Sequence, residues 1–395
     1  MEAALRVLGN PHHRFPTIHI AGTNGKGSTA AITAEILKKS GFKTGFTLSP
    51  HLEDFRERIQ VNRNWISQDA VVSLYEKMKK VLGHLPLTYF EWTILMAFLH
   101  FASSRVDIAV VETGMGGRWD ATNVVNPIAT AITNISLEHE NYLGSRLEEI
   151  LTEKMQIFKK EIPAWTGLTQ TPLWNLLQSH CRENQIPLYR LDDYYRENPD
   201  GSFSIFNYRL RCGLKGAHQN RNAALAVALC SSLMERGYGI LPGAVEAGVE
   251  EVYWPGRLEA VSQKPLILLD GAHNRGGIEA LTAYLQSAGR KYHLVFGTLT
   301  DRPFSEMLIP LMPYVHDVTL VQFDGGERSF TEQQLQELTA KLPVEVVSKI
   351  KNGTMNLTPD TWRNYLASLS PQEGILVTGS LYLVSQVRAL IKGMC

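Results

Sequence analysis

The sequence predicts an α/β protein with two doubly wound domains, a large one followed by a smaller one. Short apolar runs of the kind that form buried parallel strands alternate with longer runs in which apolar residues recur every three or four positions, as in amphipathic helices. The chain has 395 residues, too many for one ordinary hydrophobic core. The alternation breaks at residues 253–257 and then starts afresh. We therefore expect domains over residues 1–254 and 255–395.

In the first domain, strands and helices follow one another in the order typical of a parallel sheet covered on both faces. Between residues 169 and 215 the chain becomes richer in polar and aromatic residues, with turn signals at 192–193 and 198–201, which favours short antiparallel strands. The predicted strands are 18–21, 45–48, 106–112 and 128–134, and the predicted helices are 28–40, 68–82, 90–103, 147–160 and 220–235.

The second domain repeats this alternation on a smaller scale. Its apolar and periodic runs are the signature of a second open sheet with helices on its faces. The series consists of residues 266–270, 276–288, 293–297, 315–323, 331–342, 344–347, 375–378 and 380–392.

The composition is that of a globular protein without a global preference for charged partners. Lys plus Arg and Asp plus Glu both number 39, so neither nucleic acid nor an anionic membrane is an expected partner. The longest apolar stretches, 94–102 and 223–230, are shorter than the ~20 residues that span a bilayer. No secretory signal pattern opens the chain, so we expect a cytoplasmic protein, and we expect it to be a monomer. The four cysteines lack metal-ligand spacing and are expected to be reduced: Cys181, Cys212, Cys230 and Cys395.

Residues 22–29, Gly-Thr-Asn-Gly-Lys-Gly-Ser-Thr, lie between a strand pattern and a helix pattern. Glycines let the backbone curl so that N–H groups point at phosphate oxygens, and the following helix adds its positive end. Lys26 would reach the distal phosphates and the Ser28 hydroxyl would hold Mg²⁺. Gly27 displaces the hydroxyl of the strict P-loop form, so a glycine-rich turn without a ligand is the alternative. The residues expected to contact the nucleotide are Thr23, Asn24, Gly25, Lys26, Gly27, Ser28 and Thr29.

Two further groups of polar residues follow predicted strands of the first domain, and a third candidate lies in a predicted helix. Glu112 ends one strand, where open sheets present ligand-binding groups, and is a candidate Mg²⁺ ligand or a loop cap. Asp120 to Asn123 can fix the glycine-rich loop that follows this strand, between Glu112 and Asp120. His139 is a candidate for a second metal ion, although a surface hydrogen-bond partner is the commoner use of such a histidine. Lys154 falls within a predicted helix, where an ordinary solvated lysine is the default.

The second domain carries its own cluster. Asp270 and His273 end its first strand, and Arg257 opens the domain. An acid, a histidine and an arginine near a strand-to-helix turn suit contacts to ribose and phosphate, whereas a well-formed turn is the structural alternative.

Taken together and in this order, these clusters resemble the folylpolyglutamate synthase and dihydrofolate synthase family, part of the Mur ligase superfamily of ATP-dependent amide-forming enzymes. The resemblance runs from about residue 8 to the C-terminus. It implies a large P-loop-type doubly wound domain followed by a smaller Rossmann-like α/β domain. Besides the glycine loop, it rests on residues 49–52, 55–59, 88–91, 112–123, 218–224, 254–258, 270–274 and 377–380.

The resemblance implies that ATP phosphorylates a carboxylate and that L-glutamate attacks the acyl phosphate, with a folate or dihydropteroate as acceptor. By this likeness Lys26 is catalytic, Ser28 and Glu112 serve one Mg²⁺, and His139 serves a second. Lys154 matches a lysine that the family carries as a carbamate. The remaining matches divide by ligand. Asn222, Arg257 and Asp270 match nucleotide contacts, and Asp120 matches a pterin contact. His273 and Ser380 match glutamate contacts, and we also expect His273 and Lys154 to be catalytic.

Three alternatives stay open at this stage. A Mur-type ligase could act on another acid, and a P-loop kinase or GTPase would form no amide. A catalytically silent nucleotide-binding relative is the third, because Glu138 stands where the family usually has aspartate and Met155-Gln156 where it has small residues.

Overall fold

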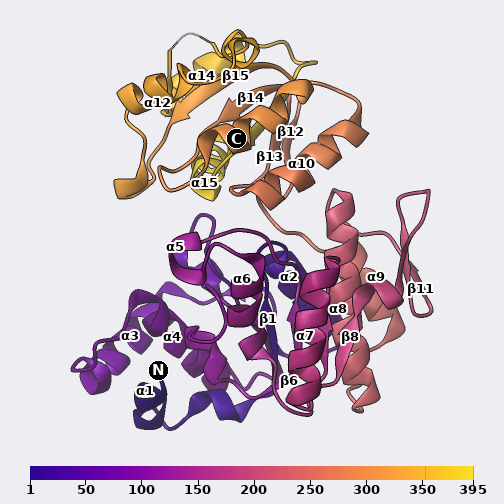
Figure 1. The fold of residues 1–395 in the computed structure, drawn as a ribbon. Helices are drawn as coiled ribbons and strands as arrows, with labels where there is room; N and C mark the ends of the chain where they lie inside the picture. Colours follow the sequence, from indigo (N-terminus) through magenta and orange to yellow (C-terminus); the bar gives the residue numbers. More distant parts are fainter. Residues whose placement is uncertain (352, 395) are drawn as a thin grey trace. The chain divides into compact units, whose positions relative to one another are not determined.

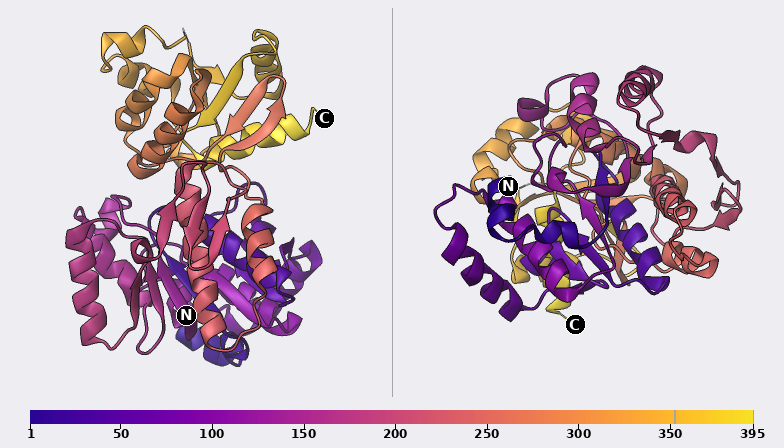
Figure 2. Two further views of the ribbon diagram at one scale, coloured as in Figure 1. Left: turned by 90° about the vertical axis from the view of Figure 1, so that its right-hand side faces the viewer. Right: turned by 90° about the horizontal axis from the view of Figure 1, so that it is seen from below.

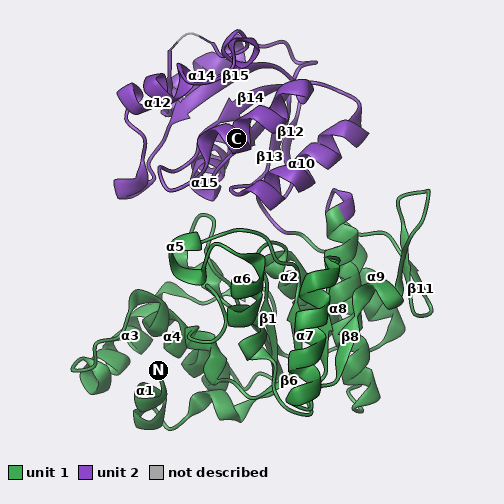
Figure 3. Cartoon of the chain, in the orientation of Figure 1, with its two compact units in different colours: residues 1–213, 218–253 green, residues 214–217, 254–395 purple. Residues whose placement is uncertain are grey.

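The computed structural model describes residues 1–351 and 353–394 of the chain. It forms two compact units (Figure 3). Unit 1 comprises Met1–Gly213 and His218–Tyr253, and unit 2 comprises Leu214–Ala217 and the chain from Trp254 onward. Within the described residues, no helix is both long and apolar enough to cross a membrane.

Unit 1 is built on an eight-stranded sheet with the strand order β4-β3-β2-β5-β1-β6-β7-β8. Figure 1 labels β1, β6 and β8 of this sheet. Six of these strands run parallel, and β3 and β4 form an antiparallel edge. The strands are β1 Thr17–Ala21, β2 Thr44–Thr47, β3 Ile59–Val61, β4 Asn64–Trp65, β5 Ile108–Glu112, β6 Pro127–Ile132, β7 Ala164–Thr166 and β8 Leu188–Arg190.

Helices cover both faces of this sheet (Figure 2). Helix α2 packs on β1, β2 and β5 and against α9, while two apolar cores join the other face to α4 and to α6 and α7. The helices of unit 1 are α1 Glu2–Val7, α2 Lys26–Lys39, α3 Gln68–Leu82, α4 Tyr89–Ser104, α5 Glu140–Leu143, α6 Leu147–Lys154, α7 Thr171–Glu183, α8 Ala217–Glu235 and α9 Pro242–Glu250.

The predicted fold class is confirmed, and the four strands predicted for the first domain are the four central neighbours β2, β5, β1 and β6. Strand β1 lies between β5 and β6. The strand order therefore reverses at β1, with β2 on one side of it and β6, β7 and β8 on the other. Loops that follow the C-terminal ends of parallel strands at such a point form the usual ligand site of open sheets.

Two predictions for unit 1 were wrong. Residues 171–183 form helix α7 rather than strands, because Leu173, Leu177 and Cys181 recur every four residues and are buried on one face. The antiparallel strands lie further along, as the three-stranded sheet of β9 Tyr195–Glu197, β10 Phe203–Ile205 and β11 Tyr208–Leu210. The helix predicted over 147–160 ends at Lys154, where a short 3-10 turn, Met155–Ile157, takes over.

Unit 2 is a smaller sheet of six strands in the order β12-β13-β17-β14-β15-β16. Five of them are parallel and β12 is an antiparallel edge. The run 344–347 forms one helical turn. The strands are β12 Glu259–Gln263, β13 Leu266–Leu269, β14 Tyr292–Phe296, β15 Val315–Gln322, β16 Met355–Asn356 and β17 Gly374–Thr378, and the helices are α10 Arg275–Ala288, α11 Phe304–Leu308, α12 Glu332–Thr339, α13 Val344–Val347, α14 Pro359–Ala367 and α15 Leu381–Lys392.

Candidate active site

The glycine loop forms a curled backbone between β1 and α2. Gly22 and Gly25 have φ values of 146° and 83°, which L-amino acids with side chains rarely adopt. The loop is fixed to the segment after β6: Asn24 N–H donates to Asn134 Oδ1 at 2.8 Å, and Thr133 Oγ1 donates to the Asn24 carbonyl at 2.6 Å. A preformed curl at the N-terminus of a 14-residue helix suits phosphate oxygens.

Lys26 is the first residue of α2 and folds back over this loop. Its Nζ donates to the carbonyl oxygens of Gly22 and Thr23, both at 3.0 Å. The ammonium group therefore lies at the loop itself, as the prediction for a phosphate-binding lysine requires. Ser28 and Thr29 follow on the first turn of α2 and are buried.

Asn222 is brought to the same loop from α8, almost two hundred residues away in the sequence. A Cβ atom built on Gly25 would lie only 2.3 Å from Asn222 Oδ1. The Asn222 side chain is held by its Nδ2, which donates to Gln219 Oε1 at 2.9 Å. Its amide is thus positioned beside the glycine loop, where it was predicted to contact a nucleotide.

Replacing Gly25 by alanine should weaken nucleotide binding by about tenfold or more, because the new methyl group meets Asn222 and requires a left-handed backbone. Calorimetric titration with ADP measures this. Gly243→Ala is the control, since its Cβ would meet no atom within 4 Å. An unchanged ADP affinity in the Gly25 variant would remove the loop from the binding site.

Lys154 is buried, with a residue exposure of 3%. Its Nζ donates to the Gly22 carbonyl at 2.8 Å, the same oxygen that Lys26 contacts. Burial, followed by the nearby charge of Lys26, lowers the pKa of Lys154 to about 7. The solvated lysine that base rates favour is therefore wrong, and at neutral pH a large part of this amine is uncharged.

Glu112 ends β5 and is buried, and its Oε2 accepts a hydrogen bond from Ser49 N–H at 3.3 Å. Arg58 contacts the same segment through two hydrogen bonds. Its Nη1 donates to Ser49 Oγ at 3.2 Å, and its Nε donates to His51 Nδ1 at 2.7 Å. Because arginine can only donate, His51 Nδ1 must accept. The motif segments 49–52 and 55–59 did not indicate these roles of Ser49 and Arg58, although the run of charged residues at 56–58 was an available signal.

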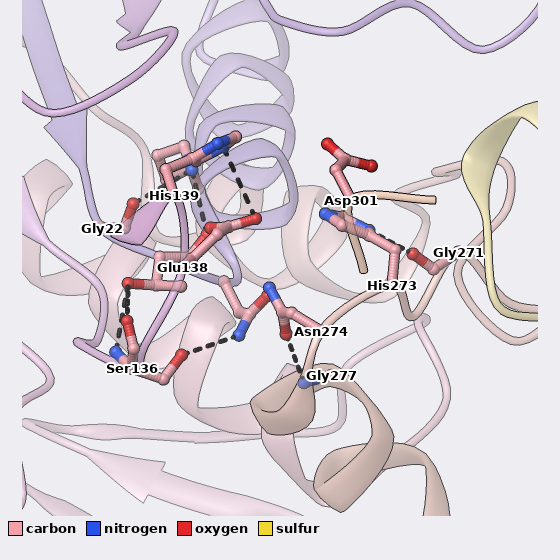
Figure 4. A network of polar contacts seen from close by, with 12 residues as sticks. Gly22, Ser136, Glu138, His139, Gly271, His273, Asn274, Gly277 and Asp301 are labelled. Carbon is pink, nitrogen blue, oxygen red and sulfur yellow. Dashed lines mark hydrogen bonds and ion pairs between the residues drawn. The ribbon is translucent and has the colours of Figure 1, made fainter. Parts of the chain in front are cut away.

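His139 itself has a left-handed backbone conformation, φ 53°, and is the N-cap residue of α5. Its Nε2 lies 3.8 Å from Glu138 Oε1, and both residues belong to the polar network that includes Gly22 and Ser136 (Figure 4). Ser136 N–H donates to Thr23 Oγ1 at 3.1 Å, and this hydroxyl donates to the Ser136 carbonyl at the same distance. The segment before His139 is therefore attached to the phosphate loop.

Asp120 organises the loop in which it lies. Oδ2 accepts from the N–H groups of Gly114 and Met115, both at 2.9 Å, and Oδ1 accepts from Thr122 N–H at 2.9 Å and Thr122 Oγ1 at 2.5 Å. Burial raises the pKa of Asp120, and these hydrogen bonds counter that effect. The carboxylate is occupied by its own loop, so the structure supports a role in shaping that loop.

The predicted residues of unit 2 gather at the C-terminal ends of its strands. Asp270 accepts from Leu258 N–H and Ala272 N–H, both at 3.0 Å. His273 Nδ1 lies 2.7 Å from the Gly271 carbonyl (Figure 4) and must donate to it. Ser380 is buried and caps α15, its Oγ accepting from Tyr382 N–H at 3.1 Å.

Arg257 lies close to this turn as well, because a Cβ on Gly271 would come within 2.9 Å of its Nη1. The structure thus brings the predicted residues together in two groups, one in each unit. Each group follows the C-terminal ends of parallel strands.

The unit 1 group fits a nucleotide with a hard divalent ion. Among the described residues, no three His, Cys, Asp or Glu side chains gather into a metal site. Magnesium is usually held by one or two carboxylates together with substrate phosphates rather than by a complete protein cage. One carboxylate beside a phosphate loop therefore suffices for its chemistry.

Comparison with known families assigns both halves of the chain. Residues 20–166 match the Mur ligase middle domain, and residues 256–381 match the Mur ligase glutamate ligase domain. The fold and the site therefore define an ATP-dependent ligase of the Mur type.

Individual relatives narrow the assignment. The chain is 33% identical to the dihydrofolate synthase/folylpolyglutamate synthase of Bacillus subtilis, over 99% of this chain and 94% of the relative. The structure of Escherichia coli FolC in complex with DHPP and ADP has a TM-score of 0.87 at 27% identity, covering 99% of this chain and 93% of that one. The bifunctional enzyme of Yersinia pestis, complexed with AMPPNP and Mn, has a TM-score of 0.85 at 27% identity, with coverage of 99% and 92%. The chain belongs to the folylpolyglutamate synthase/dihydrofolate synthase family.

Proposed function

We propose that this ligase joins L-glutamate to dihydropteroate, to a reduced folate, or to both, with ATP as the phosphoryl donor and Mg²⁺ as the metal ion. Family membership supports the reaction class, and the Yersinia pestis relative was solved with a nucleotide analogue and Mn. The further proposals are that residues 1–254 bind ATP, that residues 255–395 bind glutamate, and that the protein acts as a cytoplasmic monomer.

One observation carries the proposal: Lys26 and Lys154 both donate to the carbonyl oxygen of Gly22, at 3.0 and 2.8 Å. Lys26 places a positive charge at this point of the glycine loop, where the terminal phosphates would lie, and Lys154 places beside it an amine of lowered pKa. In phosphoryl transfer the protein acts chiefly by positioning and by stabilising charge. Lys26 would neutralise charge on the γ-phosphoryl group as it passes to the acceptor carboxylate.

Amide formation then follows from ordinary acyl chemistry. The acceptor carboxylate gains a phosphoryl group, the amine of glutamate attacks the carbonyl carbon, and phosphate leaves. Bound Mg²⁺ would offset the negative charge of the phosphates. We propose that Ser28, Glu112 and His139 hold the metal ions, with Ser49 beside Glu112.

Lys154 is proposed to act as a carbamate. A neutral amine adds to CO₂ and releases one proton, which gives a carboxylate-like oxygen ligand in place of an ammonium group. The lowered pKa of Lys154, about 7, supports this because only the uncharged amine reacts. The anionic carbamate would direct oxygen toward a metal ion beside the phosphate loop.

The remaining proposed contacts divide by substrate. Asn222, Arg257 and Asp270 would bind the nucleotide, and His273 and Ser380 would bind the incoming glutamate, with His273 also catalytic. The hydrogen bond that His273 Nδ1 donates to the Gly271 carbonyl orients the ring. The loop around Asp120 would contact the pterin.

Offering dihydropteroate and tetrahydrofolate side by side tests the proposal. Purified protein is incubated with ATP, Mg²⁺ and L-glutamate, phosphate release is measured, and the products are weighed by mass spectrometry. Release that depends on either acceptor, with a product heavier by one glutamyl residue, is expected. Nucleotide binding without acceptor-dependent turnover would instead indicate a silent relative, and hydrolysis without an amide would contradict the ligase.

A further inference from the structure

His19 is a buried polar residue in the middle of β1, the strand that leads into the phosphate loop. Its residue exposure is 0%, and it lies between Ile18 and Ile20, which are equally buried. Its Nε2 is 2.8 Å from Thr122 Oγ1. Thr122 belongs to the loop that Asp120 organises, residues 114–123, which we call the acceptor loop.

The direction of this hydrogen bond follows from its neighbours. Three backbone N–H groups donate to the Asp120 carboxylate, and such hydrogen bonds favour its ionised form, which can only accept. The single hydrogen of Thr122 Oγ1 is therefore given to Asp120, 2.5 Å away. His19 Nε2 must then donate to Thr122 Oγ1.

The environment of the other ring nitrogen shows that histidine is not the most stabilising residue at this position. His19 Nδ1 is buried and has no hydrogen-bond partner among the residues that the structure describes. A buried polar atom without a partner costs free energy, which an apolar side chain at this position would avoid. The only polar contact that the ring makes there is the one from Nε2 to the acceptor loop.

The state of the ring is also fixed. Burial, followed by the charge of Lys159, lowers the pKa of His19 to about 3, so the ring is neutral at any working pH. A neutral imidazole carries one hydrogen, and the geometry places it on Nε2.

We propose that His19 is a positioning residue that ties the acceptor loop to β1 and so sets the distance between the acceptor and the phosphoryl donor. The inference rests on the proposed function, in which this loop contacts the acceptor. The loop exposes Trp119, at 87%, and Met115, at 40%, two apolar side chains that suit a flat ring. Only Ile20 and Ala21 separate His19 from Gly22, the first residue of the glycine loop.

Steady-state kinetics of three variants test the inference. His19→Leu removes the donor, whereas His19→Gln places an amide N–H near the position of Nε2. His12→Leu is the matched control, because His12 is also buried with an unpartnered Nδ1 and stacks on Phe98, whereas the hydrogen bond to Thr122 comes from His19. We expect His19→Leu to raise the KM for the acceptor about tenfold, with the KM for ATP nearly unchanged. In His19→Gln the KM for the acceptor should return most of the way to the wild-type value.

An acceptor KM in His19→Leu that matches His12→Leu would overturn the inference, as would an equal rise in the KM for ATP. Hydrogen exchange supplies a readout that needs no turnover: exchange at the amides of Gly114 and Met115 should speed up in His19→Leu, but not in His12→Leu. If the wild-type protein forms no glutamyl product while this exchange difference is present, the proposed function fails and the tether stands. Equal exchange in both variants would rule out the tether.

Discussion

Lys26→Ala should lower turnover by roughly 10²–10³-fold, the largest loss expected from a single charge in this molecule. The ammonium group lies within hydrogen-bond distance of two carbonyl oxygens of the phosphate loop. The other lysines of α2, Lys38 and Lys39, lie in its last turn, so neither can replace Lys26 at the loop. Single-turnover phosphate release with saturating ATP isolates the chemical step.

Lys38→Ala provides the control for this prediction. Lys38 lies on the same helix but near its other end, where it pairs with Glu35 at 3.2 Å, so its removal tests the loss of a lysine that does not contact the glycine loop. We expect near-normal turnover there. Near-normal turnover in Lys26→Ala itself would refute the role assigned to this residue.

Lys154→Ala should also reduce turnover by about two orders of magnitude, and short-chain carboxylates such as acetate should restore part of it. The substitution leaves a space beside Gly22 where the amine had donated at 2.8 Å, and a small carboxylate can supply the oxygen that the carbamate would have provided. The same acids should not rescue Lys26→Ala, because that variant lacks a cation. Full activity of Lys154→Ala would dismiss the carbamate.

The pKa of Lys154 gives this prediction a pH dependence. With a value of about 7, the amine is roughly 90% protonated at pH 6 and roughly 90% neutral at pH 8. Only the neutral form adds CO₂, so protein depleted of bicarbonate should regain activity on adding bicarbonate at pH 8 and much less at pH 6. Equal recovery at both pH values would contradict a carbamate at this amine.

The curled glycine loop between β1 and α2 and the central strands could be predicted because their signals are local. Three glycines and a lysine within eight residues, placed between a strand and a helix pattern, constrain the backbone directly. The four apolar runs that became β1, β2, β5 and β6 are short, continuous and bounded by turns. Helix α7 was missed because its polar face outweighed a narrow apolar stripe at Leu173, Leu177 and Cys181.

The environment of Lys154 could not be predicted from its neighbours in the sequence. Local periodicity continues the helix past it, whereas the structure ends the helix there and buries the amine against Gly22, 132 residues away. The contact of His19 with Thr122 spans 103 residues in the same way. Such contacts depend on which strands become neighbours, and no local pattern encodes that choice.

The central claim is that a carboxylate is activated by phosphorylation at the glycine loop, and isotope transfer tests it most directly. The acceptor is prepared with ¹⁸O in its carboxylate and turned over with ATP and L-glutamate, and the released phosphate is examined by mass spectrometry. The account predicts one ¹⁸O atom in each phosphate, because the acceptor oxygen that receives the phosphoryl group leaves with it. Amide product accompanied by phosphate free of ¹⁸O would contradict the account.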